Sequence, residues 1–293
     1  MIRYPIMHTK STILACTDGS RYAASVYSHA AWAAPRIDAR VHVLHIIDSR
    51  REAVPHVDLS GSIGMNARIA LKEELVALDE ARGRLAQARA TIILNEARAH
   101  FDLAGMGDVQ FEARHGHLLE TIEEQEKQAS LIVVGKRGEA ANFDKMHLGA
   151  HLERVIRSAK RPVLVSSRAF KPIERMLIAY DGGPSSRKAV EYAASKPLLR
   201  GLKCVLLAGG RPSSAIENDL KDAADALRGA GYDVETHHEK GHAEDVIADT
   251  VKQANIDLLV MGAYGHSRIR QLMVGSTTTA MVRTCLVPVL LFR

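Results

Sequence analysis

Glycines and hydroxyl residues near the C-terminus form the pattern in this chain that is best suited to chemistry. An apolar run over residues 258–261 leads into Gly262, and Gly265 follows three positions later. After nine further residues, Gly275 and Ser276 open a stretch that is compatible with a helix. Glycine lets a backbone take positive φ and approach a ligand closely, and the free amides of a helix start attract anions. The pattern predicts a site for a di- or triphosphate; a plain turn followed by a helix cap is the alternative.

The same order of motifs occurs in both halves of the chain, which indicates an internal repeat. An apolar run that ends in Asp-Gly comes first, a glycine motif follows, and a Pro-Val-Leu segment closes each half. Gly135 precedes Gly262 by 127 positions, whereas Gly149 precedes Gly275 by 126. The glycine loop of the first half is therefore one residue longer.

The first half also carries an insertion. Asp18 precedes Asp181 by 163 positions, and the difference between 163 and 127 leaves 36 extra residues, which fall within residues 49–107. Residues 71–99 are rich in Ala, Leu, Glu and Arg and predict a long helix despite Gly83. The preceding residues, 48–66, contain a proline and two glycines and predict a surface loop.

Strand-length apolar runs alternate with helix-like stretches in each half, as in βαβ units on a mostly parallel sheet. The fold class is therefore α/β. The expected strands of the first half are residues 11–17, 40–47, 109–114, 131–135 and 162–166. Those of the second half are residues 175–180, 202–208, 234–238, 258–262 and 287–292.

Length and composition agree with two ordinary globular domains. The 293 residues are 46% hydrophobic and 25% charged, and we place the domains at 1–168 and 169–293. No apolar run approaches the roughly 18–20 residues of a membrane span, and the N-terminal residues do not resemble a secretory signal, so we expect a cytoplasmic protein with no membrane partner. The net charge of +5 is dispersed, with only short basic runs, and does not indicate nucleic acid binding.

The second half resembles a universal stress protein domain. Gly262, Gly265, Gly275 and Ser276 fit the ATP-binding motif of that family, whose fold is Rossmann-like with five strands. The resemblance extends over nearly the whole chain as two copies. It implies ATP as the ligand, alone or with Mg²⁺, and further adenosine-side and phosphate-side contacts. The positions that match these contacts are Ala179, Asp181, Ala208, Met261 and Thr277.

The first half departs from the family pattern. Gly138 is separated from Gly149 by ten residues, and Ala150 stands where the motif has a hydroxyl. Loss of one hydrogen bond to a charged group costs about 1.5–3 kcal/mol, before the altered loop is counted. We therefore expect a degenerate partner domain with at most a weak site. The residues of that weaker site are Asp18, Ile46, Gly135, Gly138 and Gly149.

The last strand of each half is apolar and would be an open edge if it were unpaired. In the family such strands pair across a dimer, so the resemblance implies two halves packed as a pseudo-twofold intramolecular dimer. The remaining apolar helix faces predict a homodimer of such tandem chains. Capping of each edge within its own domain is the alternative.

Other side chains do not indicate a catalytic or metal site. Histidines cluster after the third strand of each half, at 115 and 117 and at 237, 238 and 242, without an established ligand spacing. No catalytic residue is assigned, and the Walker lysine is missing. The sequence thus predicts an ATP-binding stress-response module; the alternatives are a slow ATPase or adenylating enzyme, and a nucleotide-free dimeric scaffold.

Overall fold

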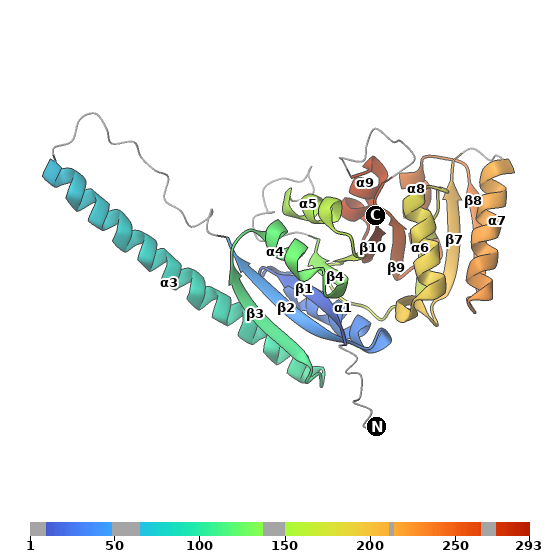
Figure 1. Cartoon of the computed structure of the whole chain (residues 1–293). Coiled ribbons are helices and arrows are strands. Elements are labelled where there is room, and N and C mark those ends of the chain that lie inside the picture. The colour runs from blue at the N-terminus through green and yellow to red at the C-terminus, as the bar shows by residue number, and fades with distance from the viewer. Residues whose placement is uncertain (1–9, 49–64, 137–149, 211–213, 265–273) are drawn as a thin grey trace, which may run out of the picture.

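Ten strands from both halves of the chain form one continuous sheet (Figure 1). The computed structural model describes residues 10–48, 65–136, 150–210, 214–264 and 274–293. The strands of the first half are β1 (Ser11–Thr17), β2 (Ala39–Ile47), β3 (Val109–His115), β4 (Ala129–Gly135) and β5 (Val163–Ser166). Those of the second half are β6 (Arg175–Ala179), β7 (Lys203–Gly209), β8 (Val234–Glu239), β9 (Leu258–Gly262) and β10 (Val289–Phe292). All ten expected strands are present, with ends that shift by no more than two residues.

The strand order is the same in both halves, which confirms the repeat. It runs β3-β2-β1-β4-β5-β10-β9-β6-β7-β8. Neighbouring strands within each half are parallel, and β5 pairs with β10 in the antiparallel sense, with Leu164 opposite Leu290. The two apolar edges therefore cover each other inside one chain, and the predicted pseudo-twofold arrangement is confirmed.

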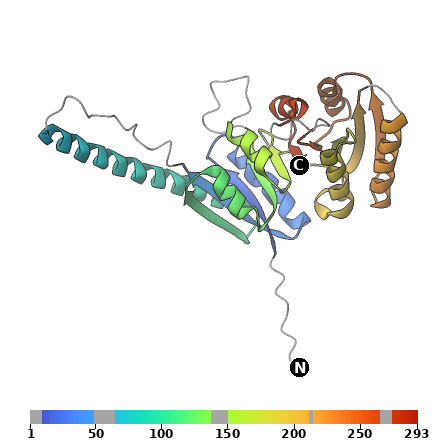
Figure 2. The same ribbon diagram turned by 45° about the horizontal axis from the view of Figure 1, so that its top comes forward.

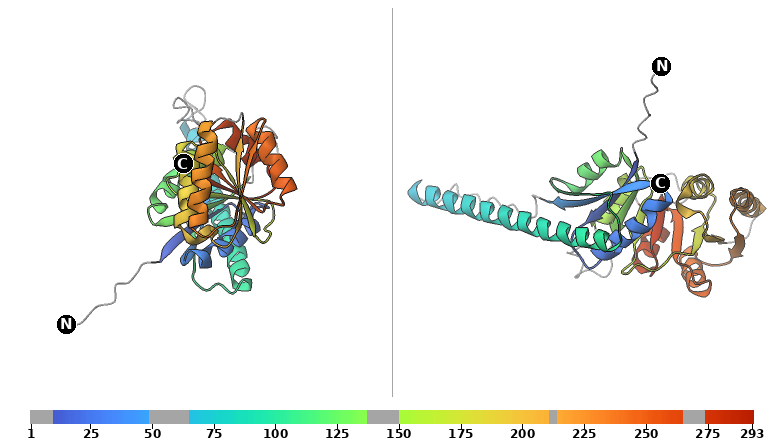
Figure 3. Two further views of the ribbon diagram at one scale, coloured as in Figure 1. Left: turned by 90° about the vertical axis from the view of Figure 1, so that its right-hand side faces the viewer. Right: turned by 90° about the horizontal axis from the view of Figure 1, so that it is seen from below.

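Helices cover both faces of the sheet, as Figures 2 and 3 show. The helices on one face are α1 (Ala23–Arg36), α3 (Met65–Leu103), α6 (Pro184–Ser195) and α7 (Ser214–Gly229). Those on the other face are α4 (Leu118–Gln125), α5 (Ala150–Ser158), α8 (Ala243–Gln253) and α9 (Ser276–Thr284). A short 3-10 helix, η1 (Pro197–Leu199), precedes β7. Because both faces are covered, strands such as β9 are apolar at every position rather than at alternate ones.

Side chains beyond the central strands also join the two halves. Arg36 of α1 donates to the carbonyls of Leu198 and Arg200 at 3.3 and 2.9 Å. On the other face, the Tyr264 hydroxyl donates to the carbonyl of Arg157 at 3.2 Å. Contacts on both faces of the sheet therefore hold the antiparallel junction.

The two halves differ most in one helix. α3 has 39 residues, whereas α7, which occupies the same place in the second half, has 16. The predicted helix over 71–99 is confirmed and extends further at both ends. Of the loop predicted over 48–66, residues 49–64 lie outside the described part, and residues 65 and 66 belong to α3 instead. Among the described helices, none is long and apolar enough to cross a membrane.

Candidate functional site

The predicted second-half site lies where two parallel strands send the chain to opposite faces of the sheet. β6 and β9 are neighbours, with Ala179 opposite Met261 near their carboxyl ends. The chain continues from β6 into α6 on one face, and α9 follows β9 on the other. Open α/β sheets bind ligands at such a switch point. The strand order thus brings two distant parts of the sequence to one location.

Asp181 organises the turn that follows β6. Its Oδ1 accepts hydrogen bonds from the Gly183 amide at 2.9 Å and from the Ser186 hydroxyl at 2.6 Å. Gly182 has a φ of +73°, which favours glycine. The carboxylate therefore fixes the start of α6 and remains at the exposed end of the strand.

Gly262 has a packing role that the sequence does not reveal. A Cβ added there would lie 2.8 Å from Ser185 Cβ and 3.0 Å from the Ser186 amide nitrogen, because α6 begins directly against this residue. Gly262 is the last residue of β9 and its φ is not positive. Gly262 therefore does not use the positive φ that glycine allows; close approach of α6 is what requires glycine here.

The start of α9 is tied to the end of β9 by two hydrogen bonds. The Gly275 amide donates to the Ala263 carbonyl at 3.1 Å, and the Thr278 hydroxyl donates to the Gly262 carbonyl at 3.0 Å. Gly275 is the N-cap residue, with φ −59° and ψ 146°, so it does not adopt the left-handed conformation either. These bonds hold both ends of the glycine loop together and place Ser276 in the first turn of α9.

The hydroxyl residues of that first turn have different environments. Ser276 is exposed, Thr277 is half-buried, and Thr278 is buried at 3% exposure. The first amides of a helix have no partner within the helix and favour an anion. Sequence reasoning missed Thr278, although the uninterrupted hydroxyl run from 276 to 279 is a visible signal.

The predicted apolar residues of the site do not all face the same way. Ala179 and Met261 belong to the face that α8 and α9 cover. Ala208, near the end of β7, is fully buried and its side chain packs on the opposite face, under α6 and α7. Only the backbone of Ala208 can therefore line the same site. Gly265 lies outside the described residues.

The family model for universal stress proteins matches the chain twice, over residues 10–167 and 172–293. The chain belongs to the universal stress protein family. A curated relative, universal stress protein Slr1230 of Synechocystis sp., is 40% identical over 285 residues, covering 96% of this chain and 99% of that protein. A universal stress protein of Mycolicibacterium smegmatis is 26% identical over 205 residues, covering 63% and 69%.

Solved structures show the same fold. The crystal structure of a universal stress protein from Archaeoglobus fulgidus aligns with a TM-score of 0.71 at 21% identity, covering 97% of this chain and 99% of that one. A putative universal stress protein from Pseudomonas aeruginosa aligns with a TM-score of 0.61 at 17% identity, covering 97% and 93%. Both alignments span the two halves together, so the double-domain arrangement recurs in other members of the family.

The first universal stress domain preserves the turn after its first strand. Asp18 Oδ1 accepts a hydrogen bond from the Ser20 amide at 3.0 Å, as Asp181 does with Gly183. Gly19 has a φ of +70°, and a Cβ there would lie 2.6 Å from the side chain of Ile93 in α3. This turn is therefore packed against the sheet-bound part of α3.

The helix start of the first domain has lost the hydroxyl that secures its counterpart. α5 and α9 both have nine residues, and the shift of 126 places Leu152 at the position of Thr278. Leu152 is buried at 7% exposure and has no hydroxyl to donate to the end of β4. Gly135 ends β4 as Gly262 ends β9, while Gly138 and Gly149 lie outside the described residues.

The adenosine side of the first domain also differs. Cys16 lies opposite Leu44, as Ala179 lies opposite Leu207, so a larger side chain stands at the position of Ala179. In the same register His45 corresponds to Ala208, and Ile46 lies one residue further along β2.

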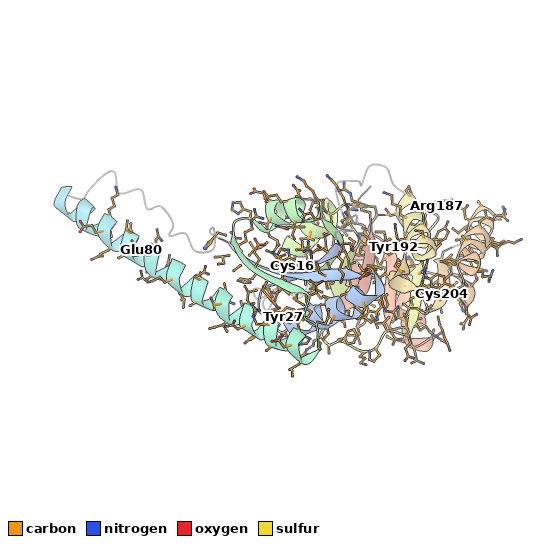
Figure 4. The ribbon with its side chains drawn as sticks, turned by 60° about the horizontal axis from the view of Figure 1, so that its bottom comes forward. Cys16, Tyr27, Glu80, Arg187, Tyr192 and Cys204 are labelled. Atoms are coloured by element: carbon orange, nitrogen blue, oxygen red, sulfur yellow. The ribbon has the colours of Figure 1, made fainter. Side chains whose placement is uncertain are left out.

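Charged groups near the second-domain turn lie at its outer rim. Arg187 Nη2 lies 2.7 Å from Asp219 Oδ2, and Figure 4 shows Arg187 at the surface. The hydrogen bond that Arg187 donates to Asp219 raises the pKa of Arg187, and burial raises the pKa of Tyr180. Among the residues that the structure describes, no group of three His, Cys, Asp or Glu side chains is placed to hold a metal ion.

Proposed function

We propose that this universal stress protein binds ATP in its second domain. The observation that carries the proposal is the tie between β9 and α9, through Gly275 to Ala263 and Thr278 to Gly262. It places the first turn of α9 beside the switch point between β6 and β9. A phosphate group there would meet helix amides and the hydroxyls of Ser276 and Thr277.

The base and the ribose of the nucleotide would lie at the carboxyl ends of the strands. The half-buried side chain of Ala179, which lies beside the buried Met261 on one face of the sheet, suits an aromatic base, and the backbone at Ala208 continues this apolar surface. Asp181 stands at the end of β6, where a carboxylate can accept hydrogen bonds from ribose hydroxyls. Mg²⁺, where present, would be held by the phosphates.

Binding without rapid turnover fits a signalling role in the stress response. Nucleotide occupancy would change the surface at the first turn of α9 and thereby change which partners recognise it. The proposal includes a homodimer of tandem chains, for which a surface is argued below.

Nucleotide released from the purified protein and identified by mass spectrometry tests the ligand. ATP added to nucleotide-free protein is expected to raise the melting temperature, because a ligand that binds only the folded state stabilises it. Ser276→Ala should weaken this shift. Thr284→Ala, which removes an exposed hydroxyl at the other end of α9, should leave the shift unchanged.

Product release from ATP tests the first alternative, and the melting temperature tests the second. Sustained release of ADP or AMP at roughly tens per second would indicate an enzyme instead of a binding module. The paired strands β5 and β10 favour a nucleotide-free scaffold as the second candidate, because this junction consists of protein groups only. That candidate requires the same melting temperature with and without ATP in both the native chain and Ser276→Ala.

A further inference from the structure

The insertion in the first domain extends α3 well beyond the sheet (Figures 1 and 3). The C-terminal part of α3 packs in the core under the sheet through Ala97 and Phe101, and Ala90 and Ile93 are also buried. Residues 71–89 contain no buried side chain. We call residues 71–92 the α3 arm; at 1.5 Å per residue it is about 33 Å long.

The α3 arm carries an apolar stripe that faces away from the body. Leucine or isoleucine recurs every seventh residue, and these residues, which we call the outer stripe, are Leu71, Leu78, Leu85 and Ile92. Leu78, Leu85 and Ile92 are 43%, 71% and 60% exposed. Ile92 is nine residues from Phe101, which packs in the core, or about 180° around the helix, and this places the stripe on the outer side.

The outer stripe fills one of the two contact positions of a coiled-coil heptad, and Ala81 and Ala88 fill the second position in the middle of the arm. Apolar residues at seven-residue intervals stay in register with a partner helix over several turns. Helices in proteins gain most of their stability from the packing of an apolar face, so the arm gains stability from a partner. The spacing indicates that the partner is another helix.

The charges of the arm indicate which helix that is. Residues 71–80 contain four acidic side chains and Lys72, for a net charge of −3, whereas residues 81–92 contain three arginines and no acid, for +3. Figure 4 marks Glu80, near the change of sign. This balance counts every charge, including those of arginines with contacts inside their own chain.

We propose that the α3 arms of two copies of this chain pair antiparallel through the outer stripe. Antiparallel pairing sets the acidic half of each arm against the basic half of the other, whereas parallel pairing sets like charges together. The sign changes near the middle of the arm, so a twofold axis there satisfies both halves at once, as an isologous dimer requires. This surface is separate from the proposed nucleotide site.

The mass of the full-length protein in solution tests the pairing. Light scattering coupled to size exclusion should give twice the chain mass of 32.0 kDa. Leu85→Glu should give the monomer, because it buries a charge in the pair. The proposal is overturned if the native chain is monomeric throughout the concentration range, which would mean that residues of its own chain cover the stripe. It is also overturned if the Leu85→Glu protein remains dimeric.

Val76→Glu is the matched control. Val76 is also exposed, at 51%, but it lies about 200° from Leu78 around the helix and outside the stripe. The Val76→Glu protein should remain dimeric. Its melting temperature should not fall, because glutamate is a better helix former than valine. Dissociation by Val76→Glu as well as by Leu85→Glu would show that any added charge on the arm disrupts the dimer, and would overturn the assignment to the stripe.

Crosslinking tests the direction. Ala81→Cys lies near the proposed axis, so a short bis-maleimide should join two copies, above the background of the native chain. Glu74→Cys should not join to itself, because antiparallel pairing separates the two copies of this residue by about 21 Å. Efficient joining at Glu74 without joining at Ala81 would contradict the antiparallel arrangement.

Discussion

The two domains share a sheet order and differ at the start of one helix. In the second domain, α9 begins with Ser276, Thr277 and Thr278, and Thr278 is bonded to the end of β9. In the first domain, the same positions are Ala150, His151 and Leu152. The framework tolerates this difference because strand order and core packing do not depend on those hydroxyls. The comparison shows that the hydroxyl residues at this helix start can be absent from one copy while the fold is kept.

Exchange of the three hydroxyl residues tests this comparison most strongly. Ser276→Ala, Thr277→His and Thr278→Leu together give the second domain the helix start of the first. Two lost hydrogen bonds to phosphate, at about 1.5–3 kcal/mol each, should weaken ATP binding by about 100-fold or more. Isothermal titration calorimetry measures the change.

The reciprocal exchange is the control. Ala150→Ser, His151→Thr and Leu152→Thr together should not create a second ATP site, because the preceding loop retains its extra residue. Unaltered ATP affinity in the triple variant would mean that the asymmetry between the domains lies elsewhere.

A second contrast concerns equivalent residues of α1 and α6. His29 is fully buried against Phe170, with ring centroids 5.0 Å apart, and Tyr192 lies 4.9 Å from Phe292 in the same way. Burial lowers the pKa of His29 to about 4, although its hydrogen bond to the Ser25 carbonyl opposes this. The unfolded chain therefore binds more protons than the folded one between pH 6.5 and 4.

The contribution of His29 to the free energy of unfolding should accordingly be fully present above pH 6.5. It should fall by roughly 3 kcal/mol as the pH drops towards 4. Denaturant unfolding of His29→Phe across that range should show a shallower loss than the native chain. Tyr192→Phe should keep the native slope, because burial raises the pKa of Tyr192 to about 12. Parallel curves for native protein and His29→Phe would refute the role of His29.

Two glycines allow a comparison between a packed and an open position. Gly262→Ala should destabilise the protein by about 1–3 kcal/mol, because the new Cβ would overlap Ser185. Gly83→Ala should stabilise α3 by about 1 kcal/mol, since nothing lies within 4 Å of its added Cβ. Thermal unfolding should give shifts of opposite sign; shifts of the same sign would contradict the close approach of α6.

The smallest expected effect concerns the tie at the end of β9. Thr278→Val keeps the shape but leaves the Gly262 carbonyl without this donor, at a cost of about 1 kcal/mol. Thr278→Ser retains the hydroxyl and should recover part of that stability. If the Thr278→Val and Thr278→Ser proteins both unfold at the melting temperature of the native chain, the hydrogen bond contributes nothing measurable to stability.

Most of the fold could be predicted because it follows from local patterns. Apolar runs of strand length identified all ten strands, and high helix propensity identified the middle of α3 despite Gly83. The offsets of 127 and 126 are preserved in the structure, where Gly135 and Gly262 end equivalent strands and α5 and α9 have equal length. These features depend on residues close together in the chain, so the sequence reveals them directly.

The sequence by itself determined the repeat, the strands and the asymmetry between Ser276 and Ala150. Only the tertiary structure decided that Gly262 makes room for α6, that Thr278 rather than Ser276 secures the helix start, and that Ala208 faces away from Ala179. Each of these depends on the distance or direction between segments that meet only after folding. The α3 arm combines the two kinds of information: its leucines are visible in the sequence, but only packing of the rest of α3 on the sheet turns the outer stripe away from the body.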